Sequence, residues 1–578
     1  MTGAEGTEQE SNSILQVIGY HQQTKHHLYR YARALGYMDW ANQPDPFRRY
    51  AGAPVVPLPI LAEKDDPHSP TYGDLYRWGS IPSQPVTHKT ISRFLQYALS
   101  LTAWKEAGGT RWALRANPSS GNLHPTEGYL LLNGLPDLGS TPGLYHYASK
   151  EHALERRAEL TSDCFGELMQ PFPPFAFLMA WTSIHWREAW KYGERGFRYC
   201  QHDVGHAVGA ARIAAASLGW RMRLLDGTGD DLLAGLLGLN RAEDVGAAER
   251  EHPDCVAVVW PGARNAEFPL SLPGHAAELI KGARWHGTAN RLSRGVPDPW
   301  EIIEVVVAAS WKPALKETPG AEIATAHEPD GHPDLRRASS GASHSDVSAG
   351  QVILQRRSAL AFDGSTALSS PSFFTMLDRV MPRPDRLLLE RTIPWDAIPW
   401  PPAIHLALFV HRVERLEPGL YMLVRDPAKS GDVRASMHPH FLWTTPPGCP
   451  EDLPLYLLET GDARKLAAQV SCHQDIAADG AFSLGMIAEF DATLRRHGAW
   501  FYRRLFWETG VIGQVLYLEA EAAGIRATGI GCFFDDPVHQ VFGWTTMAYQ
   551  SLYHFTVGRH VEDPRLTTLP PYDPVRRA

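Results

Sequence analysis

The stretch FRYCQHDVGHAVGAARIAAASLG, residues 197–219, decides the fold, because a degenerate copy returns as YRRLFWETGVIGQVLYLEAEAAG, residues 502–524. Both copies continue as a run of small and apolar residues that suits a buried helix, and both stop at a glycine, as a left-handed C-cap requires. A strand-like run follows each glycine, WRMRLL after Gly219 and IRATGIG after Gly524. The sequence therefore predicts the same helix and strand twice.

A second pair of matching segments extends this repeat. PGLY at residues 142–145 recurs at residues 418–421, and in both places a Pro-Gly turn precedes an aromatic, strand-like run. We interpret the chain as a tandem duplication of one α+β unit. The predicted parts are an N-terminal extension (1–84), unit 1 (85–317), a flexible linker (318–350) and unit 2 (351–578). The linker is rich in Ser, Gly, Ala, His and Asp, and it has too few large apolar residues to fold alone.

Composition narrows the class of protein. The 578 residues are 44% hydrophobic with 18 Trp, which is enough for extensive cores. The absence of a long apolar run and the polar, acidic start predict a cytoplasmic protein with no membrane partner. The net charge of −9, with basic and acidic residues interspersed, argues against nucleic acid. The six Cys lack a CxxC pair, which argues against a zinc site or a disulfide framework and predicts buried thiols.

The loop RANPSSGNLHPTE, residues 115–127, is small and polar in a way that suits a ligand-facing backbone. Its proline fixes one φ angle, its hydroxyl and amide groups offer short donors and acceptors, and its glycine leaves room for a planar ring. The same residue types are also common in tight turns that bind no ligand.

Four motifs in one order carry a resemblance to a known family. PSSGN is followed by PGLYHY at residues 142–147, by WKYGERGFRYCQHDVGH at residues 190–206, and by a small-residue helix that ends in LGW at Trp220. The chain resembles the nitroreductase superfamily of FMN enzymes, and in particular its SagB/ThcOx-type dehydrogenases, which oxidise azoline rings in peptides. The resemblance implies units with a central antiparallel sheet flanked by helices, paired here as a pseudo-dimer within one chain.

The resemblance also implies where FMN binds. In family homodimers one subunit supplies an Arg-x-Ser-x-basic motif and a backbone stretch near the flavin N5, and the other supplies the Pro-Ser-Ser loop. Unit 2 contains QRRSALAF at residues 355–362, with Leu360 in the later basic position, and TGIGCFFDD at residues 528–536. The expected FMN-binding residues are Arg115, Pro118, Ser119, Ser120, Gly121, Asn122, Arg356, Arg357, Ser358, Gly529 and Gly531.

A second, reciprocal site would need the same two motifs with the roles of the units exchanged, and both motifs are missing. Unit 2 reads IPWPPAIH at residues 398–405, where unit 1 has its loop, and unit 1 has no Arg-x-Ser in IPSQPVTHKTISRF, residues 81–94. We therefore expect one FMN per chain, held between the units, with the second site vestigial.

Lys191 and Tyr192 match the Lys-Tyr pair of the azoline dehydrogenases, so the resemblance makes them the candidate catalytic residues. Oxidation of an azoline needs a base for one proton while the flavin accepts a hydride. The dipeptide also fits an ordinary helix surface with one solvated and one half-buried side chain. Arg198 and Arg503 precede Asp203 and Glu508 by five residues, and pairing with these carboxylates or with the flavin phosphate is open. His202 and His206 lack a third ligand, so we expect no metal site, and we expect Asp203 to cap the helix.

Three functions remain open from the sequence. The first is an FMN-dependent dehydrogenase acting on a modified peptide or a related small heterocycle. The second is a nitroreductase-like or quinone-reductase-like enzyme supplied by NAD(P)H. The third is a non-catalytic flavin-binding or scaffold protein. Lys191 and Tyr192 favour the first function, because a reductase supplied by NAD(P)H needs no lysine base.

Overall fold

Two antiparallel sheets with the same strand order form the framework of the computed structural model, which describes residues 2–137, 139–262, 266–314, 346–383 and 391–573. The unit 1 sheet has the order β11-β7-β6-β5-β8-β10-β9, with β2 on β7, and the unit 2 sheet has the order β15-β14-β13-β16-β18-β17. Corresponding strands therefore occupy corresponding places. The prediction of two α+β units with antiparallel sheets is confirmed.

The strands have the following bounds. In unit 1 they are β2 (Val55–Pro57), β5 (Thr126–Leu132), β6 (Gly143–Ala148), β7 (Ala153–Glu159), β8 (Phe177–Ser183), β9 (Trp220–Leu224), β10 (His252–Pro261) and β11 (Arg284–Trp285). In unit 2 they are β13 (Ile404–Val410), β14 (Gly419–Leu423), β15 (Leu455–Thr460), β16 (Phe482–Glu489), β17 (Arg526–Ile530) and β18 (Tyr549–Gly558). Outside these sheets lie β1 (Tyr50–Ala51), β3 (Leu101–Ala107), β4 (Thr110–Arg115), β12 (Thr288–Ala289) and β19 (Thr567–Leu569). The strands predicted after Gly219 and Gly524 are β9 and β17, and those predicted at the two PGLY motifs are β6 and β14.

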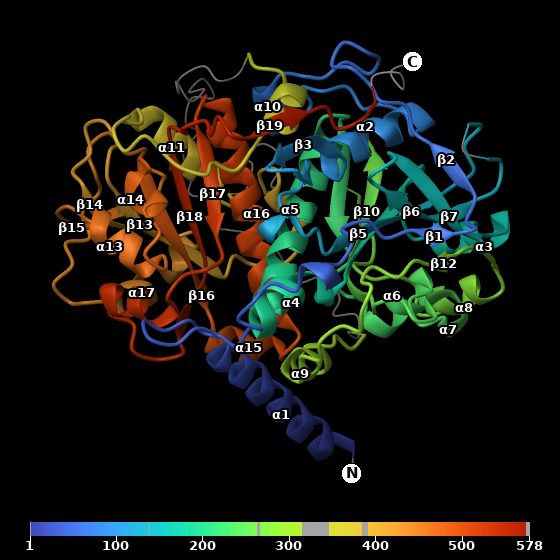
Figure 1. Ribbon diagram of the computed structural model, residues 1–578, viewed down its shortest axis with the longest axis horizontal. Helices are drawn as coiled ribbons and strands as arrows, with labels where there is room; N and C mark the ends of the chain where they lie inside the picture. Colours follow the sequence, from blue (N-terminus) through green and yellow to red (C-terminus); the bar gives the residue numbers. More distant parts are fainter. Residues whose placement is uncertain (1, 138, 263–265, 315–345, 384–390, 574–578) are drawn as a thin grey trace, which may run out of the picture.

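The helices surround these sheets (Figure 1). In the N-terminal half they are α1 (Thr2–Gln23), α2 (His88–Ala98), α3 (Ser162–Met169), α4 (His185–Tyr192), α5 (Gly196–Ala216), α6 (Asp230–Leu237), α7 (Ala242–Val245), α8 (Ala276–Lys281) and α9 (Glu301–Ala309). In the C-terminal half they are α10 (Ala349–Gln355), α11 (Ser370–Arg379), α12 (Ser430–Ala435), α13 (Arg464–Val470), α14 (Ile476–Asp479), α15 (Asp491–His497), α16 (Phe501–Ala522) and α17 (Asp535–Phe542). Of the predicted linker, residues 318–345 lie outside the described residues, and Ala349 already begins α10.

Helices α5 and α16 pack against each other at the centre of the molecule, between the two sheets (Figure 1). They are the repeated stretches of the sequence, and each is followed by a left-handed glycine, Gly219 at φ +64° and Gly524 at φ +72°. The helices meet at Gly205 and Gly510, where an added Cβ would collide with the backbone of the opposite helix. Small residues at the crossing therefore let the two units share one core.

Both sheets are buried on both faces because alternate residues of each strand enter different cores. In β5, Leu130 belongs to the core shared with α5 and α16, whereas Leu131 belongs to an outer core of unit 1. In β13, Leu408 belongs to the shared core and Phe409 to an outer core of unit 2. The shared core fixes the geometry at the boundary between the units.

Reciprocal ion pairs also cross this boundary. Arg198 donates to Asp535 over 2.9 Å, and Arg503 donates to Asp230. Each aspartate begins a short helix of the opposite unit, α17 or α6. Of the alternatives left open by the sequence, pairing with the carboxylate five residues on is therefore not the arrangement found. Asp203 does not cap a helix either, because α5 begins at Gly196 and holds Asp203 in its interior.

Segments near both chain ends contact unit 1. Strand β19 pairs with β3 in a three-stranded sheet of order β19-β3-β4, and the Tyr572 hydroxyl accepts a hydrogen bond from the Leu101 amide over 2.9 Å. At the other end, α1 runs up to the boundary from below in Figure 1, where the Tyr20 hydroxyl donates to the Glu194 carbonyl over 2.7 Å. Among the described residues, no helix is long and apolar enough to cross a membrane.

Candidate functional site between the units

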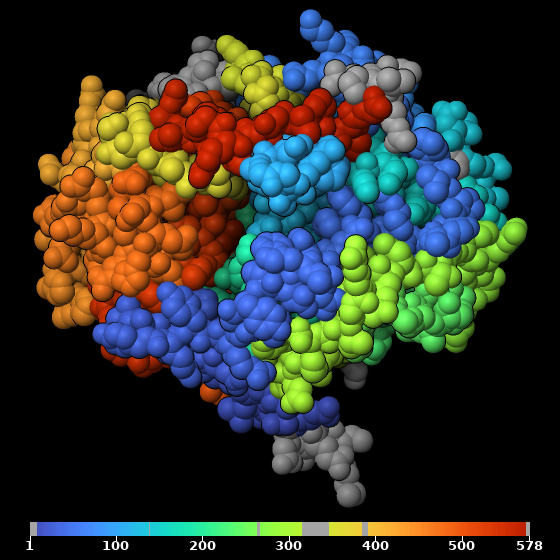
Figure 2. All heavy atoms as spheres, in the orientation of Figure 1, coloured from blue at the N-terminus to red at the C-terminus, as the bar shows by residue number. Residues whose placement is uncertain are grey.

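A cavity of about 270 Å³ lies at the boundary between unit 1 and unit 2. Figure 2 shows a hollow in this face, with unit 2 in orange and red on its left and the light-blue atoms around β3 and β4 on its upper right. The walls come from β4, the following loop, α5, the segment after α10, α16, β17, β18 and residues 561–566. Of the predicted FMN-binding residues, these line the cavity: Arg115, Pro118, Ser119, Ser120, Gly121, Asn122, Arg356, Arg357, Ser358 and Gly529.

The loop at residues 118–122 joins β4 to β5 and is held by its own hydrogen bonds. Gly121 has φ +62° and Asn122 has φ +56°, so the chain turns sharply here. The Ser119 hydroxyl accepts from the His124 amide over 2.8 Å, and the His124 ring hydrogen-bonds the Ala113 carbonyl over 3.0 Å. The residues do form a tight turn, and the turn presents its backbone to the cavity in a fixed shape.

Arg356 brings a buried positive charge with free hydrogen-bonding capacity to the cavity. Its Nη2 donates to the Arg115 carbonyl over 3.1 Å, while Nε and Nη1 are buried and have no partner among the described residues. Burial lowers the pKa of Arg356, which shows that no nearby carboxylate compensates its charge fully. Buried guanidinium groups are normally paired. Such a group beside a cavity fits an anionic ligand.

The neighbouring side chains are already engaged. Arg357 donates to the Thr102 carbonyl over 3.1 Å and to the Leu354 carbonyl over 2.9 Å. Ser358 shares a hydrogen bond of 2.9 Å with the Tyr517 hydroxyl, which also accepts from the Gly529 amide over 2.9 Å. The segment after α10 is therefore fastened to α16 and β17. Leu360 lines the cavity where the family motif has a basic residue. Lys105 and Arg526, which the sequence did not predict, also line it, and Arg526 pairs with Glu562 of the same lining over 3.0 Å.

Gly531 is the one predicted FMN-binding residue outside the cavity lining. Its Cα faces the ring of Tyr199, with which an added Cβ would collide, and its carbonyl accepts from Arg195 over 3.2 Å. Gly529 is different, because it lines the cavity and an added Cβ would collide with the Tyr553 hydroxyl. Gly529 belongs to β17, whereas Gly531 follows the last residue of that strand, Ile530, so strand geometry no longer fixes the face that Gly531 presents.

Lys191 and Tyr192 reach the loop from α4, although neither lines the cavity. A Cβ on Gly121 would lie 2.7 Å from the Tyr192 hydroxyl and 3.0 Å from Lys191 Nζ. Tyr192 packs on Tyr199, with ring centroids 4.3 Å apart. Burial, followed by the charge of Glu188, holds the pKa of Tyr192 well above its ordinary value, so the phenol stays protonated. The structure thus brings both predicted catalytic residues to the back of the loop.

Two buried carboxyl groups behind the loop were not predicted as site residues. Asp203 lines the cavity, and its Oδ1 accepts from the Ser120 amide over 3.3 Å while Oδ2 has no partner among the described residues. Both oxygens of Glu188 are also buried without a partner in that set. Burial raises the pKa of Asp203 to about 7 and raises that of Glu188 well above its ordinary value. One sequence signal existed, because Glu188 shares a helix face with Lys191 and Tyr192.

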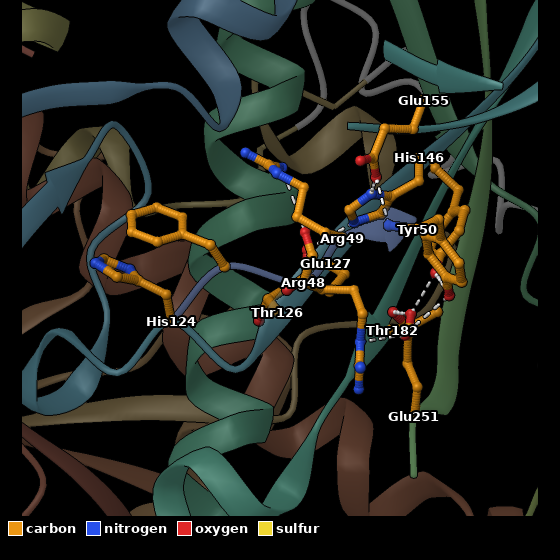
Figure 3. A network of polar contacts seen from close by, with 12 residues as sticks. Arg48, Arg49, Tyr50, His124, Thr126, Glu127, His146, Glu155, Thr182 and Glu251 are labelled. Carbon is orange, nitrogen blue, oxygen red and sulfur yellow. Dashed lines mark hydrogen bonds and ion pairs between the residues drawn. The ribbon is translucent and has the colours of Figure 1, made fainter. Parts of the chain in front are cut away.

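A buried polar network anchors the far end of the loop (Figure 3). His146 lies between Glu127 and Glu155, with both distances 2.9 Å, and Arg187 donates to Glu127. Burial opposes charge on His146, but the two carboxylates outweigh it and raise the pKa of His146. Glu127, in β5, is therefore paired with His146 of β6 and Arg187 of α4. Arg48, drawn in the same figure, lies 3.7 Å from Glu251.

The reciprocal position at the boundary is nearly closed. Aligning residue 197 with residue 502 places Arg212 opposite Tyr517 and Arg221 opposite Arg526. Arg212 hydrogen-bonds both oxygens of Asp396 over 3.0 Å, and Arg221 lies 4.0 Å from the centre of the Trp78 ring. The space left there is about 30 Å³.

The histidines of α5 serve packing and hydrogen bonding. The His202 ring contacts the Thr509 hydroxyl over 2.9 Å, and His206 lies 3.3 Å from the Tyr553 hydroxyl. Within the described residues, no group of three or more His, Cys, Asp or Glu side chains is placed to hold a metal ion.

Comparison with known proteins agrees with this architecture. Residues 410–559 match the family model described as "Nitroreductase family". A protein of Methanocaldococcus jannaschii described as a "putative nitroreductase" is 28% identical over 143 residues, which cover 24% of this chain and 67% of the relative. A solved structure from Anabaena variabilis with the same description has a TM-score of 0.64 at 21% identity and covers 94% of this chain and 99% of its own. Within unit 2, residues 410–559 are thus similar to the nitroreductase family, and the Anabaena structure shares the fold of nearly the whole chain.

Proposed function

We propose that this protein is an FMN-dependent oxidoreductase that holds one FMN between its two units. The observation that carries the proposal is the cavity itself, because the loop at residues 118–122 comes from unit 1 while Arg356, Ser358 and Gly529 come from unit 2. Neither set would make a site alone. This division is the one that the resemblance to nitroreductase homodimers implies, so the chain acts as an intrachain pseudo-dimer that arose by tandem duplication.

The chemistry of the lining fits FMN. A phosphate group carries nearly two negative charges and is best held by a guanidinium fork with hydroxyl or amide donors. Arg356 supplies two unused, buried nitrogen atoms, and Lys105 lies in the same lining. The backbone of the loop at residues 118–122 and Gly529 would hold the ring system. When bound, FMN supplies the capacity to accept a hydride.

The contrast between the two boundary positions supports a single site. The cavity of about 270 Å³ faces the predicted motifs, whereas about 30 Å³ remains at the reciprocal position, where Arg212, Asp396 and Trp78 fill the space. A buried ion pair of this kind is costly to break. FMN could bind there only if this ion pair were broken, so we expect one FMN per chain.

For the reaction, we propose oxidation of an azoline ring in a peptide or a related small heterocycle to the aromatic azole. Lys191 is the base that removes the proton, since its Nζ lies behind Gly121 and forms no ion pair with another residue that the structure describes. Tyr192 stays protonated and so can donate a hydrogen bond. Asp203, with its pKa raised to about 7, can hold or release a proton near neutral pH, and burial raises the pKa of the neighbouring Glu188 well above its ordinary value.

The test uses FMN-loaded protein, a thiazoline-containing peptide and an added electron acceptor. Mass spectrometry should show a product that has lost two hydrogen atoms, and Lys191→Ala should slow this reaction by about 10²–10⁴-fold while it retains FMN. Lys64→Ala, at an exposed position in the N-terminal extension, is the matched control. Rapid NAD(P)H consumption with a quinone, unaffected by Lys191→Ala, would instead identify a reductase.

A further inference from the structure

Cys472 and Cys532 meet in space although sixty residues separate them in sequence. Cys472 lies in the turn after α13, Cys532 follows β17, and the two sulfur atoms share a hydrogen bond of 2.9 Å. Both side chains are half-buried, so small reagents can reach them. The expectation of buried thiols is therefore wrong for this pair, as it is for Cys164 and Cys449, which are also half-buried. Sequence spacing could not reveal it, because the fold alone brings the two segments together.

The backbone around the pair holds the sulfur atoms in place. The Phe534 amide donates to the Val470 carbonyl over 2.8 Å, and the Gln474 side chain donates to the Cys532 carbonyl over 2.9 Å. Cys472 and His473 both adopt left-handed conformations, at φ +55° and +58°. Two successive non-glycine residues in this region are uncommon and costly, and surrounding contacts must maintain them. The thiols are thus kept side by side by a rigid frame.

The electrostatic surroundings favour a thiolate on one partner. The hydrogen bond with Cys472 lowers the pKa of Cys532 to about 5, and His26 and Arg195 act in the same direction against burial. The pKa of Cys472 is raised by the same hydrogen bond and by burial. Asp535 also faces the pair, but Arg195 and Arg198 neutralise it. An accessible thiolate with a second thiol in contact is the arrangement of a redox-sensitive cysteine pair.

We propose that Cys532 and Cys472 form a peroxide-sensitive dithiol, in which Cys532 is the attacking thiolate and Cys472 is the resolving thiol. The Cys532 sulfur attacks the distal oxygen of a hydroperoxide, the O–O bond breaks, and an alcohol or water leaves as Cys532 becomes a sulfenic acid. The Cys472 sulfur then displaces that oxygen as water, which forms the disulfide. The two thiols are oxidised by two electrons, the hydroperoxide is reduced, and a dithiol reductant reverses the change.

The pair stands apart from the proposed FMN site, since neither cysteine lines the cavity. It is nevertheless connected to the loop by packing. Gly531, next to Cys532, faces the ring of Tyr199, which packs on Tyr192. The dithiol proposal does not depend on FMN binding, and it can be tested in protein with or without cofactor.

The first experiment treats the fully reduced, full-length protein with one equivalent of hydrogen peroxide and counts thiols after denaturation. The count should fall from six to four, and peptide mass spectrometry should identify a Cys472–Cys532 disulfide that dithiothreitol reverses. Cys472→Ser should leave a sulfenic acid on Cys532 that dimedone traps, and Cys532→Ser should lose reactivity. Loss of thiols at other cysteines, or equal loss in Cys532→Ser, would overturn the proposal.

A second measurement needs no variant and so survives a folding defect. Cys449 is also half-buried, but burial raises its pKa to about 11. At pH 7 a much larger fraction of Cys532 than of Cys449 is thiolate, although the Cys532 thiolate is the weaker base and therefore the weaker nucleophile. Together these effects predict that iodoacetamide labels Cys532 on the order of tenfold faster than Cys449. Labelling of Cys449 at the same rate or faster would contradict the proposed roles.

Discussion

Replacing Arg356 with Gln should weaken FMN binding far more than it weakens the fold. Two buried nitrogen atoms of Arg356, Nε and Nη1, are without partners among the described residues, and Arg356 belongs to the lining of the cavity. A hydrogen bond to a charged group contributes about 1.5–3 kcal/mol, so two such bonds to a phosphate contribute about 3–6 kcal/mol. The dissociation constant of FMN should therefore rise by roughly 10²–10⁴-fold in Arg356→Gln.

Quenching of flavin fluorescence, titrated at constant ionic strength, measures this change directly. Arg357→Gln is the matched control, because the Arg357 guanidinium is already occupied by the Thr102 and Leu354 carbonyls, and its effect should not exceed about tenfold. Thermal melting of the cofactor-free variants checks the fold, since Arg356→Gln loses the 3.1 Å bond to the Arg115 carbonyl and the contact of the guanidinium with the Tyr517 ring, whose centre is 5.0 Å away. Binding of FMN by Arg356→Gln within about threefold of the unchanged protein would refute the reasoning.

Three further predictions concern the boundary between the units. Asp203 has its pKa raised to about 7, so the folded protein keeps a proton that the unfolded chain releases near pH 4, and the contribution of Asp203 to stability falls as pH rises from about 4 to 7. Asp203→Asn should therefore raise the melting temperature of the cofactor-free protein at pH 8 by more than at pH 4.5, and a gain independent of pH would contradict this. Gly205→Ala should lower the melting temperature, because overpacking against α16 should reduce the free energy of unfolding by at least about 1–3 kcal/mol. Gly166→Ala, where an added Cβ meets nothing within 4 Å, should leave the melting temperature unchanged. Gly121→Ala should slow turnover more than it weakens FMN binding, because φ is +62° and the new Cβ would press on Tyr192 and Lys191; kcat and the FMN dissociation constant, measured on one preparation, separate the two effects.

The repeated elements could be predicted from the sequence because their signals are local. The helix before Gly219 or Gly524, the strand after it and the Pro-Gly turns each depend on residues within one segment. The pairing of residues 118–122 with Arg356 across the boundary was also predicted, but through the resemblance and the asymmetric loss of motifs. Physical reasoning from spacing alone did not join two segments that far apart in the chain.

The features that the sequence did not predict depend on long-range packing. Arg198 and Arg503 pair with aspartates of the opposite unit, which no spacing rule within a helix can show. The pairing of β19 with β3 was not predicted, because a short, polar strand has too little periodicity to indicate which strand it pairs with. Asp203 looked like a capping residue, and only its burial behind Ser120 shows it to be a candidate site residue.

The stoichiometry of flavin in the purified protein tests the central proposal most directly. The protein would be reconstituted with excess FMN and freed of unbound cofactor, and the released flavin would be identified by chromatography and compared with protein concentration. One FMN per chain is the predicted result, because one boundary position offers about 270 Å³ beside an uncompensated arginine and the other about 30 Å³. Two FMN per chain would contradict the single site, and none after reconstitution would contradict the flavin enzyme itself.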